Sequence, residues 1–168
     1  MSDGSNGQST AGALPQDGAP PDVGIQAIGQ YVKDLSFENP GAPLNLTVRP
    51  QIELGVDLQA KRLDPERFEV ELKLRVSAQA EGKPVFLLEL VYGGLFQVQG
   101  NPPEEFLQQV LLIDAPHLLF PFARRIVADA VRDGGMPPLM IEPINFAALF
   151  RAKAAEGKIQ TTAPAQTA

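Results

Sequence analysis

Few residues of this chain have side chains suited to catalysis, and their spacing argues against an active site. The sequence holds one histidine, His117, and no cysteine, which excludes thiol catalysis, disulfides and metal sites built on thiolates or clustered histidines. A serine–histidine–aspartate triad would have to use Ser36 or Ser77, and both fall on alternating positions of expected strands. Asp34 and Glu38 would lie about 13 Å apart along a strand, too far for coupled acid–base catalysis. We therefore expect no enzyme and no cofactor.

Composition narrows the range of partners. The 168 residues carry a net charge of −6, and such a surface repels phosphate backbones and suits a basic protein partner. The basic pairs Lys61–Arg62 and Arg124–Arg125 have no interleaved aromatic residues for base stacking, so no nucleic acid is expected as a partner. The sequence also lacks a glycine-rich loop for phosphate and a nucleophile-elbow motif.

The sequence shows no sign of a membrane or export segment of its own. No apolar run approaches the ~20 residues of a membrane helix. A secretory signal is not expected, because no Lys or Arg precedes Lys33 and the N-terminal stretch has no apolar region. The absence of cysteine fits a reducing compartment. These observations predict a cytoplasmic protein with no direct membrane insertion.

The clearest structural signal is a pair of strands between Arg67 and Tyr92. From Arg67 to Ala78, polar and apolar residues alternate without interruption, which predicts a strand with one face in the core and one in water. The outward residues are Arg67, Glu69, Glu71, Lys73, Arg75 and Ser77. Residues 81–84, which include Gly82, predict a tight turn into the next strand.

The second strand of the pair, residues 85–92, is apolar on both faces except for Glu89. If it keeps the alternation, Leu87 and Val91 flank Glu89 on the outward face. This arrangement indicates either a docking patch or a central strand covered on both sides, and the residues alone leave both open. The following Gly93–Gly94 predicts a bulge or a close approach of another backbone.

Two further strands are expected before this pair. The first covers residues 25–38, and its polar face consists of Asp34, Ser36 and Glu38. Its expected core face consists of Tyr31, Leu35 and Phe37. After a rigid connection at 39–43, period two returns over residues 44–60, where Pro50 indicates an edge or a kink. Consecutive strands with short links predict an antiparallel sheet.

After Gly100 the apolar period changes from that of a strand to that of a helix. Prolines and acids at 101–105 predict the start of a short helix. A second, longer helix is expected from Asp114, as its N-cap, to about Asp133, with a kink or break at Pro121. His117 lies on this helix and is expected to be structural. An apolar segment without periodicity at 136–144 and a short helix from Phe146 to about Ala155 follow.

The chain is expected to contain one folded domain, at 25–156, between disordered tails at 1–24 and 157–168. Its apolar residues exceed what one small sheet covers, so the domain must oligomerise, bind apolar ligands, or both. The excess lies at Leu87 and Val91, in the helical cluster 118–122 and in the stretch 139–141. An acidic oligomer that is structural or binds small ligands is the alternative class of protein.

Four blocks of residues carry a resemblance to a known family. They are Tyr31–Pro40, Gly93–Phe96, Leu119–Arg124 and Pro143–Phe150. In this order and spacing they closely resemble the signature of SecB, the bacterial protein-export chaperone family, in its alpha-proteobacterial form. The resemblance implies an α+β fold, in which a four-stranded antiparallel sheet, a meander with a crossover loop, carries a short and a long helix on one face.

The resemblance also implies an ATP-independent chaperone that holds precursor proteins unfolded in the cytoplasm and delivers them to the SecA motor. It implies a homotetramer, a dimer of dimers, whose interface uses Ile126, Val127, Ala130 and Val131. The implied SecA-binding residues are Asp34, Glu38, Leu87 and Glu89. The implied groove for unfolded clients comprises Phe37, Pro40, Pro43, Leu118, Phe120, Phe122, Met136, Leu139, Met140 and Ile141. No cofactor and no metal are implied.

Overall fold

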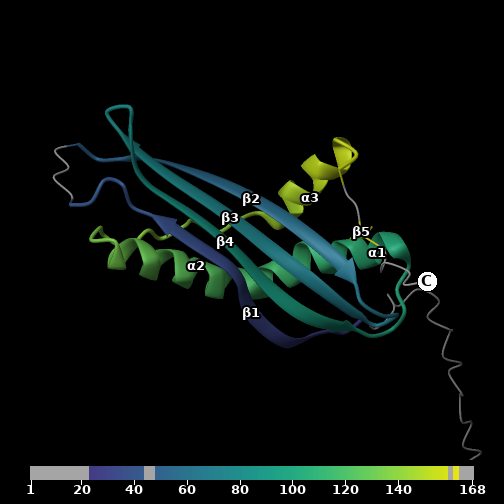
Figure 1. The fold of residues 1–168 in the computed structure, drawn as a ribbon. Coiled ribbons are helices and arrows are strands. Elements are labelled where there is room, and N and C mark those ends of the chain that lie inside the picture. The colour runs from purple at the N-terminus through teal and green to yellow at the C-terminus, as the bar shows by residue number, and fades with distance from the viewer. Residues whose placement is uncertain (1–22, 44–47, 159–160, 163–168) are drawn as a thin grey trace, which may run out of the picture.

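The computed structural model describes residues 23–43, 48–158 and 161–162. Its sheet contains four long antiparallel strands, which are β1 (Ile25–Glu38), β2 (Gln51–Arg62), β3 (Arg67–Ala80) and β4 (Lys83–Val98) (Figure 1). Their order is β1-β4-β3-β2, so β2, β3 and β4 form a meander and β1 crosses over to pair with β4. The predicted α+β architecture is confirmed.

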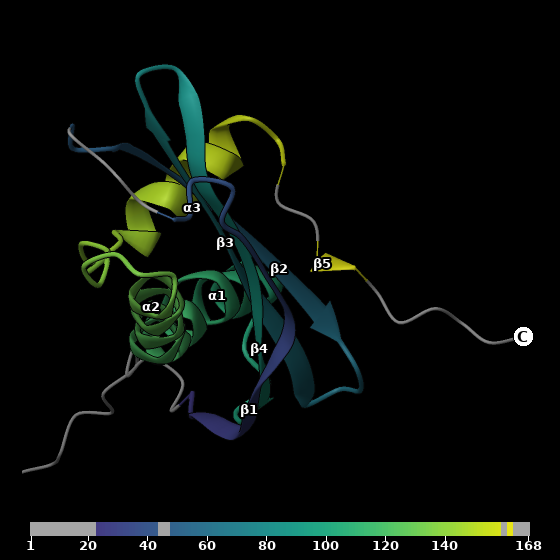
Figure 2. The same cartoon turned by 60° about the vertical axis from the view of Figure 1, so that its left-hand side comes forward.

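The core lies on one face of the sheet. Alternate residues of β3 from Phe68 to Ala78 are at most 1% exposed, as the alternation predicts. The matching face of β4 is also buried, whereas Leu87, Glu89 and Val91 point to the opposite, outer face and are half-buried. Figure 2 shows α1 and α2 on the core side, with no described helix over the outer face.

A tight turn joins β3 to β4. Glu81 and Gly82 have positive φ angles of 52° and 74°, the combination that a two-residue primed hairpin turn requires. Gly82 adopts it without a steric penalty. The register then shifts by one residue between Ala78 and Gln79, so the pairing farther along the hairpin is not the one that the turn alone predicts.

An extra residue in β1 reverses the predicted alternation of that strand. Lys33 is inserted at a register shift in the pairing with β4, and a second register shift lies upstream, between Ala27 and Gly29. The extra residue at Lys33 moves the side chains between the two shifts to the opposite face. Tyr31 therefore lies on the outer face, where its hydroxyl donates to Glu69. The prediction that Tyr31 shares the core face with Leu35 and Phe37 is wrong for this reason.

The helical region is one continuous element. Helix α1 (Glu104–Gln109) passes through a π-helical turn, η1 (Val110–Asp114), into α2 (Ala115–Asp133). The prediction that Asp114 caps a separate helix is wrong, because Asp114 has helical φ and ψ and its side chain makes no capping hydrogen bond. The wide turn brings three consecutive residues, Val110, Leu111 and Leu112, into the core, and their burial favours continuation of the helix.

The helix also continues through Pro121, where a kink or break is predicted. Pro121 lies on the exposed side of α2, where water can bond to the backbone carbonyl that lacks its usual donor. Gly134 and Gly135 end the helix as predicted, and Gly135 has a φ of 85°. None of the described helices is long and apolar enough to cross a lipid bilayer.

The remaining elements lie beside β2. Helix α3 (Phe146–Ala155) covers the predicted residues, and the Asn145 side chain caps it by accepting from the Ala148 backbone amide at 2.9 Å. β2 begins only at Gln51, after Pro50, although the predicted strand starts at residue 44. Residues 44–47 of that prediction lie outside the described part of the chain.

A two-residue strand, β5 (Thr161–Thr162), pairs in parallel with β2 at Ala60 and Lys61. Alternation cannot predict it, because two residues show no period. It falls within the expected tail at 157–168, of which the structure describes 157–158 and these two residues. Of the expected tail at 1–24 only residues 23–24 are described, so both tails stay predictions.

Candidate functional site

The outer face of the sheet brings together the four residues predicted to bind SecA. In the pairing of β1 with β4, Glu38 lies opposite Leu87, and Asp34 lies opposite Val91. Glu89 lies between Leu87 and Val91 on β4, so it is a diagonal neighbour of both carboxylates on β1. Three acids and two apolar residues thus share one accessible surface (the outer patch). Its role in binding stays a prediction.

One carboxylate of the outer patch already has a partner within the chain. Arg75 lies opposite Glu89 on β3, and its Nη1 donates to Glu89 Oε1 at 2.5 Å. Both side chains are accessible, 63% for Arg75 and 43% for Glu89. Asp34 and Glu38 form no ion pair with any described residue. The alternation places Arg75 on the outer face, but it does not show which residue of β4 stands opposite.

A second polar group ties β1 to β3 across β4. The Tyr31 hydroxyl donates to Glu69 at 2.7 Å, and Lys33 Nζ lies 3.1 Å from Glu69 and 2.5 Å from Glu71. These four residues (the polar clasp) reach over Gly93, where a Cβ atom would lie 2.6 Å from Tyr31 Cε2. The prediction of a bulge or a close approach of another backbone at the glycine pair is wrong, because the groups that approach closely are side chains and the β3–β4 register has no shift there.

The polar clasp shifts the protonation of its own members. Burial, the hydrogen bond with Glu69 and the negative charge of Glu69 together raise the pKa of Tyr31 to about 12. Burial opposes ionisation of Glu69, but the hydrogen bonds from Tyr31 and Lys33 outweigh it and lower the pKa of Glu69. Hydrogen bonds to Glu71 and Glu69 raise the pKa of Lys33. The clasp thus keeps a neutral tyrosine beside charged partners.

On the core side, an apolar hollow of about 370 Å³ opens near the C-terminal end of α2. Its lining residues are Arg49, Pro50, Ile52, Phe86, Val131, Met136, Pro137, Pro138 and Leu139. Met136 and Leu139 belong to the predicted client groove. Sequence reasoning missed Ile52 and Phe86, because alternation shows that they face the core side but not that this end of the sheet stays accessible.

The other predicted groove residues do not all join this apolar hollow. The ring of Phe37 lies 5.7 Å from that of Phe86, one of the lining residues. Pro40 and Pro43 are exposed in the connection that follows β1. Met140 is 56% exposed, whereas the adjacent Ile141 is buried in the core.

Three predicted groove residues lie on α2, on two different sides of the helix. Leu118 and Phe122 are 42% and 46% exposed. Phe120 is buried, with its ring 6.1 Å from that of Phe146. Phe120 is therefore part of the hydrophobic core. Leu118 and Phe122 lie on the accessible side of α2, apart from the apolar hollow.

Of the four residues predicted for the subunit interface, two are buried within the protomer and two lie on the accessible side of α2. Val127 and Val131 are buried within the protomer, at 0% and 2% exposure. Ile126 and Ala130 are half-buried and continue the four-residue spacing of Leu118 and Phe122. The accessible side of the helix thus carries one apolar line (the α2 stripe), which consists of Leu118, Phe122, Ile126 and Ala130.

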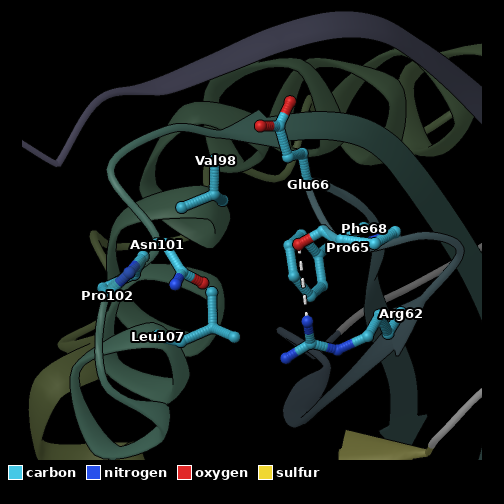
Figure 3. Close-up of a pocket in the computed structure, with 8 residues that line it drawn as sticks. All are labelled: Arg62, Pro65, Glu66, Phe68, Val98, Asn101, Pro102 and Leu107. Atoms are coloured by element: carbon cyan, nitrogen blue, oxygen red, sulfur yellow. Dashed lines mark hydrogen bonds between the residues drawn. The ribbon is translucent and has the colours of Figure 1, made fainter.

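A smaller hollow of about 250 Å³ lies at the opposite end of the sheet, between the end of β2 and the start of α1 (Figure 3). Its guanidinium group, from Arg62, lies 4.8 Å from the centroid of the Phe68 ring. Arg62 also donates to the Pro65 carbonyl at 3.4 Å and pairs with Glu104 at 3.2 Å. The Arg62 guanidinium, the cation in this hollow, thus already has partners within the chain.

The single histidine has structural partners. His117 Nδ1 donates to the Ile113 carbonyl at 2.7 Å, and the imidazole packs edge-on against Phe146 with the ring centroids 5.0 Å apart. Across the described ranges of the chain, no cluster of three or more His, Cys, Asp or Glu side chains could hold a metal ion. The described residues thus form an α+β protein with three accessible surfaces, the outer patch, the apolar hollow and the α2 stripe.

Comparison with known proteins identifies the family. The model of the SecB family, described as preprotein translocase subunit SecB, matches residues 16–157. The chain therefore belongs to the SecB family of protein-export chaperones, which are not enzymes.

Individual relatives agree with this assignment. The chain is 49% identical to protein-export protein SecB of Azorhizobium caulinodans over 142 residues, which cover 81% of this chain and 88% of the relative. It is 46% identical to protein-export protein SecB of Mesorhizobium japonicum over 154 residues, 90% of this chain and 87% of the relative. A SecB-like chaperone of Mycobacterium tuberculosis, solved in complex with a ChAD peptide from the HigA1 antitoxin, has the same fold. That match has a TM-score of 0.62 at 20% identity and covers 71% of this chain and 90% of the other.

Proposed function

We propose that this chain holds precursor proteins unfolded in the cytoplasm, without ATP, and delivers them to SecA for export. The observation that carries the proposal is the SecB family match over residues 16–157, nearly the whole described fold. The relatives at 46–49% identity are named protein-export proteins. The three accessible surfaces of the fold suit the three interactions that this function needs.

The apolar hollow supports binding of unfolded clients. Each apolar client side chain buried there contributes roughly 1.5–3 kcal/mol, and several weak contacts along one extended chain add up to useful affinity. Met136 adapts its shape to different side chains because it is unbranched and flexible. A folded client keeps its apolar residues inside, so this surface selects unfolded chains.

The outer patch supports docking of SecA. Its three carboxylates attract a basic partner and accelerate encounter, while Leu87 and Val91 provide apolar contact area on the same surface. This patch and the apolar hollow lie on opposite faces of the sheet, so a bound client leaves the SecA surface accessible.

The α2 stripe supports assembly into a homotetramer, a dimer of dimers, with helices between two sheets. An apolar line on an exposed helix face favours association with an equivalent surface. Edge strand β1 adds Val32 and Leu35, which are 46% and 45% exposed on the same side of the sheet. The buried Val127 and Val131 contribute to this interface indirectly, because their packing in the core holds α2 against the sheet of its own protomer.

Light scattering on the protein alone and with a slow-folding, signal-bearing precursor tests the proposal. We expect a species of about four subunits that captures the unfolded precursor without nucleotide and ignores the folded form. A monomer or dimer indifferent to unfolded chains would overturn the proposal.

A variant tests the assignment of the client surface. Leu139→Asp places a charge in the apolar hollow and should weaken capture of the unfolded precursor while SecA affinity is unchanged. The matched control is Leu63→Asp, which alters an exposed leucine, 43% accessible, in the link between β2 and β3. Equal capture by both variants and the wild type would contradict the assignment.

A further inference from the structure

The ion pair at the centre of the outer patch carries an inference about its regulation. We propose that Arg75 is an internal competitor, which occupies Glu89 and thereby sets the affinity of the outer patch for a basic partner. This inference rests on the proposed function, which makes the outer patch the docking surface, and it adds a residue that controls specificity there.

The sheet register places Arg75 where it can act. Arg75 lies directly opposite Glu89, and Nη1 and Oε1 are 2.5 Å apart. A partner cation that seeks Glu89 meets a carboxylate whose charge is already compensated. Asp34 and Glu38, the other acids of the patch, have no ion pair among the described residues. Arg75 thus acts on one member of the patch and leaves the other two free.

Lys73, the neighbouring cation of β3, does not act on the patch. It lies opposite Val91, but its Nζ donates to Gln59 at 3.0 Å and lies 3.6 Å from Glu71. Both partners lie outside the outer patch. The chain therefore provides a matched control, a cation two residues from Arg75 on the same face with other partners.

The guanidinium of Arg75 has room to leave Glu89. On its other side Arg75 lies opposite Gly55, which has no side chain to block it. A hollow of about 380 Å³ on the outer face is lined by Gly55, Asp57, Arg75 and Glu89 among others. Asp57, the diagonal neighbour of Arg75 on β2, already pairs with Lys153, so the displaced guanidinium turns into this open hollow and toward water rather than to a new partner. Exchange of Arg75 for a partner cation therefore requires no movement of the core.

Calorimetric titration with purified SecA tests the inference. Arg75→Thr removes the competitor and should bind about two- to fivefold more tightly than the wild type, the range that an accessible ion pair accounts for. Lys73→Thr removes the same charge and should change affinity less. Equal tightening by both variants would mean that only net charge matters and would overturn the inference.

A double-mutant cycle separates action through Glu89 from other effects of the substitution. Glu89→Gln removes the carboxylate for which Arg75 and the partner compete. Arg75→Thr should then give no gain in affinity in the Glu89→Gln background. A full gain in that background would show that Arg75 does not act through Glu89, and the inference would fail.

A second probe distinguishes failure of this inference from failure of the proposed function. If the wild type does not bind SecA, the docking assignment fails. The four proteins of the double-mutant cycle (wild type, Arg75→Thr, Glu89→Gln and the double variant) are therefore also titrated with a fluorescent tetralysine peptide. This peptide reports on competition for the carboxylates alone. Tighter peptide binding by Arg75→Thr only where Glu89 is present supports the inference, and unchanged binding overturns it.

Discussion

Tyr31 shows how one inserted residue changes the chemistry of a face. Because Lys33 is extra in the pairing with β4, the tyrosine points away from the core and joins Glu69 on β3. Tyr31 and Lys33 then lie side by side above Gly93 and hold the edge strand to a strand that it does not pair with. The polar clasp thus uses side chains to connect β1 and β3, between which lies β4.

The polar clasp predicts a specific loss of stability at alkaline pH. The pKa of Tyr31 is raised from 10.0 to about 12, so the folded state holds this proton more tightly than the unfolded state does. The stabilisation is complete below pH 10 and is lost as pH rises toward 12. Urea unfolding between pH 8 and 12 should show a smaller decline for Tyr31→Phe than for the wild type. Ser77→Ala, which changes a residue of the same outer face that does not titrate in this range, should decline like the wild type.

Leu87 provides a test of the outer patch at the level of one residue. Leu87→Arg removes apolar contact area and adds a positive charge beside Glu38, so SecA affinity should fall by at least about tenfold, equivalent to ~1.4 kcal/mol. Client capture should be unchanged, because the substitution lies on the face opposite the apolar hollow. Calorimetry with SecA and scattering with unfolded precursor measure the two affinities. Unchanged SecA affinity would count against the docking assignment.

At the scale of elements, the glycine pair in β4 determines how closely its neighbours approach on both faces. Gly93 leaves room for the polar clasp on the outer face. On the core face, a Cβ atom at Gly94 would lie 2.5 Å from Phe96 Cε2 and 2.7 Å from Leu119 Cδ2. Leu119 is fully buried on α2, so Gly94 sets the distance between the helix and the sheet.

This difference predicts an order of stabilities for three glycine substitutions. Gly94→Ala should lower the free energy of unfolding most, by about 1–3 kcal/mol, because the packed core cannot relax. Gly93→Ala should cost less, about 1 kcal/mol, because the accessible clasp side chains can move at the expense of their hydrogen bonds. Gly29→Ala, where nothing lies within 4 Å of the added carbon, is the control. Urea unfolding measures all three, and a reversal of the first two would contradict this account.

At the scale of the whole molecule, one sheet separates two kinds of surface. The core side carries the helices α1 and α2 (Figure 2). The apolar hollow and the α2 stripe lie on that side, and the outer face carries charged residues and the outer patch. Such a separation allows a partner on one face while clients and other subunits occupy the other. The apolar exposure of the single chain supports the proposed assembly.

The α2 stripe predicts the effect of a charge on assembly. Ile126→Asp should convert the proposed tetramer into smaller species, because a carboxylate buried between apolar helices lacks a partner. The protomer should stay folded, since the Ile126 side chain is only half-buried in it. Sedimentation velocity measures the subunit number and circular dichroism measures folding. Asp133→Asn, at the exposed end of the same helix, is the control, and a tetramer formed by Ile126→Asp would refute the interface.

Much of the fold could be read from the chain itself. β1, β3 and α3 lie at the predicted residues. The uninterrupted alternation of β3 also showed its buried face correctly, because successive side chains of a strand point to opposite faces. The family could be recognised because its residue blocks lie along the chain in order. The outward positions of Leu87 and Glu89 followed from alternation alone, since burial of one sheet face determines the other.

Tertiary structure decided which of these residues meet. The bulge at Lys33 placed Tyr31 on the outer face, and the register shift near Gln79 set Arg75 opposite Glu89 rather than opposite the buried Leu88. Packing of α2 against its sheet also separated the buried Val127 from the accessible Ile126. Local alternation shows the face of a residue, but register depends on hydrogen bonds and packing between segments distant in sequence, which no local pattern contains.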